Sequence, residues 1–312
     1  MIRKLNFQGA LLLAGVVAAL TPIVARSAPP ETSAVTVTVT AVGKKDAALR
    51  AVKKDDVEPY QGKERKQVAE WRRGEKLFLA VLIDDSLRSS IASQWNDLRA
   101  FLMAQPPTTY VAIAYTRNGT AMVAQDFTKD HALAAKALRL PLGSGGAFTS
   151  PYLAVQDWMK RWPESEERKS ILLFSSGINY FRGGSGIADP DLDSTIERAQ
   201  KENINIWTIY ARDAGGGRRS SFRTFNAQSN LARLSEETGA KSYYLGFGEP
   251  VTLKPYFDEI QMHLNNQYLL TFDGGNTSGK RKGRFDRFHV ASELPNTKFL
   301  TPSAVFLPAS GS

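Results

Sequence analysis

Residues 77–90, which read LFLAVLIDDSLRSS, decide the fold of this chain. Seven apolar residues run without a break from 77 to 83 and stop at a pair of aspartates. An apolar run of this length is typical of a strand buried on both faces, as in a parallel sheet covered by helices. Open α/β sheets bind their ligands at the carboxyl ends of such strands. Asp84, Asp85 and Ser86 are therefore candidate site residues.

Outward from this stretch, apolar strands alternate with helical patterns. Strands are expected at 110–115, 170–175, 204–210 and 241–245, and helices at 90–103, 130–139, 152–162, 191–202, 225–238 and 253–265. Asn118-Gly119 is a hairpin-turn signal, which predicts an antiparallel edge strand at 120–127. The alternation predicts an α/β fold with a doubly wound, mostly parallel, Rossmann-like sheet flanked by helices.

Both ends of the chain have a different pattern. Residues 35–40 (VTVTVT) alternate apolar and hydroxyl side chains, as a half-buried strand does. Beyond residue 266 the pattern predicts strands at 268–272, 284–290 and 299–306 without a helix between them. We therefore expect a β-rich lead-in at 29–76, an α/β domain at 77–266, and a C-terminal β segment at 267–312 that pairs with the lead-in.

Residues 1–28 have the pattern of a secretory signal peptide, with Arg3 and Lys4 before a short apolar run and small residues after it. Cleavage near Ala25 or Ala28 is expected, and an uncleaved N-terminal anchor is the alternative. The pattern predicts an exported protein, either periplasmic or secreted. No later segment has the length of a transmembrane helix. The chain has no cysteine, so disulfides, thiolate metal sites and cysteine nucleophiles are excluded.

The charge is basic, at +9 for all 312 residues and +6 once residues 1–28 are removed. Much of the excess lies at 44–76 and 280–287. A basic surface can hold anionic polymers by charge alone. Acidic residues are interleaved in the first cluster, however, so we interpret it as a solvated face and expect no nucleic-acid partner.

The element order, with Asp84-x-Ser86 after the first core strand, resembles the von Willebrand factor A domain, and more narrowly the VWFA-related proteins exported by acidobacteria. The resemblance covers about 77–266. It implies a metal-ion-dependent adhesion site, in which Mg²⁺ is bound by Asp-x-Ser-x-Ser, a later Thr, and an Asp after the fourth strand. Mg²⁺ requires six oxygen ligands in an octahedron. The remaining position is left for an acidic group of the partner.

This implied site is degenerate here. Asp84, Ser86 and Thr149 match the pattern, but the third ligand position holds Arg88 and the second carboxylate is replaced by Ser176. A guanidinium at this position can instead pair with Asp84 and take the cation's place. We therefore expect the metal to have been lost, with weak Mg²⁺ or Mn²⁺ binding as the alternative. The same residues can also be strand-end and capping groups without a ligand.

No enzyme motif is present: the three histidines lack metal-site spacing, and there is no nucleophile elbow or phosphate loop. In the predicted fold, Phe148, Tyr180 and Phe181 flank the sheet edge that carries Asp84. Aromatic side chains at such a rim are typical of protein-binding hot spots, and packing beneath the long loops is the alternative. The expected function is non-enzymatic binding of an unknown protein partner, without a cofactor. The alternatives are a metal-dependent phosphoester hydrolase that uses Asp84 and Asp85, or a structural envelope protein.

Overall fold

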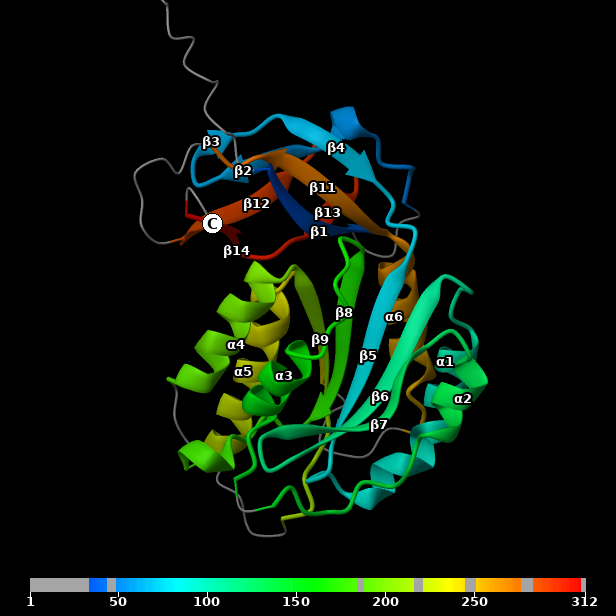
Figure 1. Ribbon diagram of the computed structural model, residues 1–312. Coiled ribbons are helices and arrows are strands. Elements are labelled where there is room, and N and C mark those ends of the chain that lie inside the picture. The colour runs from blue at the N-terminus through cyan, green and yellow to red at the C-terminus, as the bar shows by residue number, and fades with distance from the viewer. Residues whose placement is uncertain are drawn as a thin grey trace, which may run out of the picture. The chain divides into compact units, whose positions relative to one another are not determined.

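The computed structural model describes residues 34–43, 49–146, 148–183, 188–215, 221–244, 251–275 and 283–309. The expected signal peptide at 1–28 lies outside these residues. The strands of the described part form one six-stranded sheet and two four-stranded sheets. Figure 1 labels these strands and the helices between them.

The six-stranded sheet is built around β5 (Leu77–Asp84), whose eight residues are all buried. It lies between β6 (Thr109–Arg117) and β8 (Arg168–Ser175), and both neighbours are parallel to it. The full order is β10-β9-β8-β5-β6-β7, with β9 at Ile204–Tyr210 and β10 at Ser242–Tyr244. The chain leaves β5 toward one side and later continues on the other side. The carboxyl end of β5 is therefore the switch point where such sheets form a crevice.

The edge strand β7 (Thr120–Thr128) is antiparallel to β6, as predicted. Asn118 and Gly119 form the turn between them, with φ angles of 50° and 71°. Positive φ at both central residues is what a two-residue hairpin turn requires. The prediction of a doubly wound, mostly parallel α/β sheet is thus confirmed.

Helices cover both faces of this sheet (Figure 1). On one face lie α1 (Trp95–Met103), α2 (His131–Lys136) and α6 (Lys254–Asn265). On the other face lie α3 (Pro151–Met159), α4 (Pro190–Lys201) and α5 (Ser221–Glu237). The helix expected at 90–103 begins instead as a 3₁₀ helix, η3 (Ser89–Gln94), and becomes an α-helix at Trp95.

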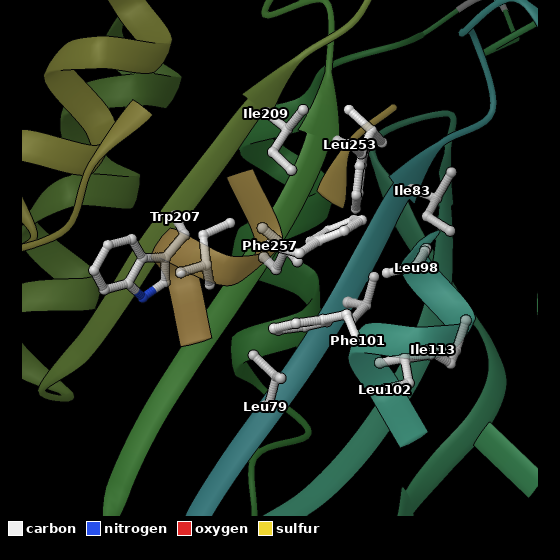
Figure 2. Packing of buried hydrophobic residues seen from close by; sticks show 14 of the residues in the cluster. Leu79, Ile83, Leu98, Phe101, Leu102, Ile113, Trp207, Ile209, Leu253 and Phe257 are labelled. Carbon is white, nitrogen blue, oxygen red and sulfur yellow. The ribbon is translucent and has the colours of Figure 1, made fainter. Parts of the chain in front are cut away.

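The first face is closely packed with large apolar side chains. Phe101 of α1 stacks on Phe257 of α6, with ring centroids 5.0 Å apart. Figure 2 shows these rings among side chains of β5, β6 and β9, including Leu79, Ile83, Ile113, Trp207 and Ile209. Burial of this kind contributes about 25 cal/mol per Å² of apolar surface. The core therefore holds β5 and its carboxyl end in a fixed position.

The other two sheets combine segments from both ends of the chain. In one sheet, β1 (Ala34–Gly43) lies between β11 (Gln267–Asp273) and β13 (Thr297–Leu300), and β4 (Val68–Arg72) pairs with β11. In the other sheet, β12 (Arg284–Ala291) lies between β14 (Ala304–Leu307) and β2 (Glu58–Gln61), which also pairs with β3 (Glu64–Arg65).

The single strand expected at 299–306 is wrong. Two strands, β13 and β14, occupy this region and belong to different sheets. Pro302 lies between them and forms a bridge with Thr238 instead. Proline lacks the N–H that a continuous ladder needs, which explains the break. Among the described residues, no helix has the length and apolar character needed to cross a membrane.

Candidate functional site

The candidate site lies where β5 ends. Asp84 is the last residue of β5, and the backbone turns at once, since Leu87 N donates to Asp84 O at 3.1 Å. The Asp84 carboxylate accepts two hydrogen bonds: Oδ1 from Ser86 N at 2.9 Å and Oδ2 from Ser175 Oγ at 2.9 Å. Ser175 is the last residue of β8, so this bond links the carboxyl ends of two neighbouring strands.

Burial dominates the electrostatics of Asp84. Removal of the carboxylate from water raises its pKa above the ordinary value, and the negative charge of Asp85 adds to this effect. The hydrogen bonds from Ser86 and Ser175 act in the opposite direction, because they stabilise the charged form. The balance leaves Asp84 easier to protonate in the folded protein than in water.

Asp85 points to a different partner. Its Oδ1 and Oδ2 accept from Arg139 Nη1 at 2.7 Å and Nη2 at 2.8 Å, and Leu142 N donates to Oδ1 at 3.3 Å. The Arg139 guanidinium also lies over the Tyr115 ring, 3.6 Å from its centroid. The hydrogen bond to Asp85 raises the pKa of Arg139. Both oxygens of Asp85 are thus occupied by the described part of the chain.

The structure brings Ser86 and Thr149 together, as the sequence predicts. A Cβ on Gly145 would overlap Thr149 Oγ1 and lie 3.0 Å from Ser86 Cβ, so these residues surround one backbone position. Thr149 Oγ1 donates to Gly146 O at 2.9 Å. Ser86 Oγ is buried and makes no hydrogen bond of ordinary geometry with any described residue. Two hydroxyls therefore lie beside the buried end of β5.

The segment after β8 contributes Ser176 and the start of a loop. Ser176 is buried, and its Oγ is 3.5 Å from Ile178 N. At Gly177 the chain takes a φ of 69°, and a Cβ there would meet the backbone oxygen of Ala227 at 2.5 Å. Only glycine allows β8 to turn this close to α5.

The possible ion pair between Arg88 and Asp84 is not formed. Arg88 is exposed, and its Nε donates to the backbone oxygen of Asp213 at 3.2 Å. Its backbone N–H donates to Arg212 O at 3.0 Å, and Leu87 forms a bridge with Asp213. These backbone contacts place Arg88 over the segment that follows β9 and direct its side chain away from Asp84.

Two further residues belong to this edge. Asp213, which follows β9, is buried and accepts a short hydrogen bond from the Tyr180 hydroxyl. Its position after a core strand is a signal that the sequence does carry. Arg139 could not be found from the sequence, because it is 54 residues from Asp85 and is expected at the end of a helix over 130–139, whereas α2 ends at Lys136.

The aromatic residues expected at the rim are present. Phe148 and Phe181 are exposed, and their rings meet edge to face with centroids 6.1 Å apart. Phe181 N donates to Thr149 O at 3.1 Å, which joins this pair to the buried site. The Tyr180 hydroxyl donates a hydrogen bond to Asp213. This rim thus carries an exposed aromatic pair that is tied through its backbone to Thr149.

The donor set does not match that of a Mg²⁺ site, which needs six oxygens and usually more than one carboxylate. Asp84, Ser86 and Thr149 are together, but both Asp84 oxygens already accept hydrogen bonds. Asp85 is occupied by Arg139, and position 176 supplies a hydroxyl instead of a carboxylate. Across the described ranges, no group of three or more acidic or histidine side chains is arranged to hold a metal.

The strand order, with an antiparallel β7 at one edge and Asp84-x-Ser86 at the switch point, is the arrangement that the sequence resemblance implies. The α/β unit has the von Willebrand factor A fold. Searches of protein-family models and of curated proteins find no match.

Several solved structures are similar to this chain, and their sequence identity to it is low. An aerotolerance-related membrane protein from Bacteroides fragilis is 10% identical, with a TM-score of 0.44 over 61% of this chain and 98% of that one. A von Willebrand factor type A protein from Catenulispora acidiphila is 9% identical, with a TM-score of 0.42 over 90% and 75%. The corresponding domain of the pilus tip protein Mfa5 from Porphyromonas gingivalis is 15% identical, with a TM-score of 0.43 over 62% and 96%.

Proposed function

We propose that this protein is an exported, non-enzymatic binding protein, and that it contacts another protein through the carboxyl edge of its six-stranded sheet. The observation that carries the proposal is the exposed pair of Phe148 and Phe181, which is joined to the buried Thr149 by the hydrogen bond from Phe181 N. Exposed aromatic rings at the centre of a surface are the side chains that most often supply binding energy.

The rim is held in place before any partner arrives. Asn179 Nδ2 donates to Asp189 and Asp191 at 2.9 to 3.1 Å, and Tyr180 donates to Asp213. The Arg182 guanidinium lies 5.3 Å from the centre of the Phe181 ring and also pairs with Asp191 at 2.9 Å. A braced loop loses little conformational entropy on binding, which favours affinity.

Binding in this proposal uses no metal and involves no catalysis. The hydrolase alternative requires Asp84 and Asp85 to hold a cation, and their oxygens are already engaged by Ser86, Ser175 and Arg139. Loss of the metal is supported by this donor chemistry and by Ser176 in place of a carboxylate. Export is supported by the signal-peptide pattern at 1–28.

Photo-crosslinking in the cells that produce the protein tests this function. A benzoylphenylalanine replaces Phe181 in one variant and Met103 in a control variant. Met103 is also exposed, at 55% against 46% for Phe181, but it is the last residue of α1. We expect a discrete crosslinked species from position 181 that position 103 does not form, and we expect its loss when Phe148 is changed to Ser. Equal crosslinking from both positions would overturn the proposal.

A further inference from the structure

At the carboxyl edge of the six-stranded sheet, the acidic side chains are buried and the basic side chains are exposed. This edge carries five aspartates, and none of them is more than 4% exposed. They are Asp84, Asp85, Asp189, Asp191 and Asp213. Each accepts hydrogen bonds from within the fold. The negative charges of the edge are therefore directed inward.

The arginines of the same edge point outward. Arg88 and Arg212 are exposed, and the Arg182 and Arg139 side chains remain 50% and 39% exposed although each pairs with an aspartate. In the described part of the chain, no carboxylate lies within ion-pair distance of Arg88. A partner that approaches this edge meets guanidinium groups first. The resulting potential favours negatively charged groups.

The loops that carry Arg139 and Arg182 also carry exposed apolar side chains. The exposed fractions of Leu140, Leu142, Phe148 and Phe181 lie between 46% and 61%. Leu142 is held by its N–H to Asp85, and Phe181 by its N–H to Thr149, so both backbones are fixed to the buried site. Fixed apolar side chains of this kind can pack against apolar side chains of a partner. Arginines beside them can each form two hydrogen bonds to one carboxylate.

We propose that the partner presents an acidic segment with apolar side chains, and that arginines bind its carboxylates directly, in the absence of a bridging cation. This inference rests on the proposed function and specifies the chemistry of the partner. A nucleic acid is the less favoured ligand, because the exposed leucine and phenylalanine side chains of this edge offer apolar contacts that a phosphate backbone does not use.

Defined peptides test the inference on the purified chain. Three fluorescent twelve-residue peptides share one Phe and one Leu, and their flanking residues are all Asp/Glu, all Ser/Asn or all Lys. Binding is measured by anisotropy at 50 and 300 mM NaCl, with EDTA or with Mg²⁺. We expect the acidic peptide to bind most tightly, with affinity that falls with salt and does not change between EDTA and Mg²⁺.

Charge variants locate the binding. Arg88→Glu is expected to lower the affinity for the acidic peptide about tenfold, as for loss of one central charged contact. Arg88→Ser is expected to lower it less. Lys63→Glu is the matched control, because it makes the same charge change at an exposed position between β2 and β3, and we expect no effect. Thermal unfolding verifies that each variant is folded.

Several results would overturn the inference: no binding of the acidic peptide, equal binding of the neutral one, binding only with Mg²⁺, or equal losses in Arg88→Glu and Lys63→Glu. Tighter binding of a DNA duplex that depends on Arg88 would also overturn it, in favour of a nucleic acid. If the crosslink from position 181 persists in any of these cases, the proposed function stands and only the chemistry of the partner is wrong. If that crosslink is absent as well, both fail.

Discussion

Arg139 and Asp85 form a two-pronged ion pair, with Nη1–Oδ1 and Nη2–Oδ2 distances of 2.7 and 2.8 Å, at the switch point of the central sheet. Asp85 is fully buried, whereas the arginine is partly open to water. The pair thus fixes the loop that carries Leu140 and Leu142 to the end of β5. It also removes one carboxylate from the set that a cation would need.

Substitution of Arg139 should destabilise the fold. Arg139→Gln leaves a buried carboxylate without its counter-charge, and we expect a loss of about 2–4 kcal/mol in the free energy of unfolding. The double variant Asp85→Asn with Arg139→Gln should recover most of the lost free energy of unfolding, because it buries no unpaired charge. Urea unfolding measures both variants. A double variant no more stable than Arg139→Gln would show that the charge is not the cause.

Asp84 and Asp97 should give stability profiles of opposite slope. Burial raises the pKa of Asp84 above its unfolded value, so its contribution to stability is present at low pH and is lost as the pH rises through the folded pKa. Asp84→Asn should therefore gain stability relative to the wild type as the pH rises from about 3.5 to 7.

Asp97 is the matched control. Hydrogen bonds, first from the Thr252 hydroxyl and also from Leu253 N, lower its pKa. Its contribution is present above the unfolded pKa and is lost as the pH falls. Asp97→Asn should lose stability relative to the wild type over the same pH rise. Urea midpoints at a series of pH values decide between these slopes, and parallel profiles for the two variants would contradict the assignment.

A carboxylate at position 176 should restore a cation site. Ser176→Asp places a second acidic group next to Ser175, which already contacts Asp84. We expect Mn²⁺ binding by calorimetry in this variant, whereas Ser176→Asn, of similar size, should give no heat. Binding by the unaltered chain at tens of micromolar would show instead that the native site holds its metal.

Two glycines on the rim loop should differ in their tolerance of alanine. Gly177 and Gly183 have similar φ angles, 69° and 82°, but a Cβ on Gly177 would meet Ala227 O at 2.5 Å, and one on Gly183 would meet nothing within 4 Å. Gly183→Ala should cost about 1 kcal/mol from strain alone, and Gly177→Ala distinctly more. Equal costs in thermal unfolding would mean that the contact with α5 relaxes easily.

The sequence predicts the central sheet well, because its signals are local. An unbroken apolar run identifies β5, and Asn118-Gly119 identifies the hairpin that precedes β7. The direction of the Arg88 side chain is not determined by local sequence, because it depends on contacts with the backbone of residues 212 and 213. The sequence therefore predicts the positions of Asp84, Ser86 and Thr149 at the site, but not which charges neutralise one another there.

The pairing of β1 with β11 has a consequence for the order of folding. Thr36 and Thr271 bond across these strands although 235 residues separate them. At a synthesis rate of about 5–20 residues per second, β1 would wait roughly 10–50 s for its partner, while β5 and β6 could already pair. During that interval an alternating Val/Thr strand is exposed to misassociation. A chain that is kept unfolded until it has been translocated would avoid this interval, and hydrogen exchange during refolding should show protection in β5 before β1.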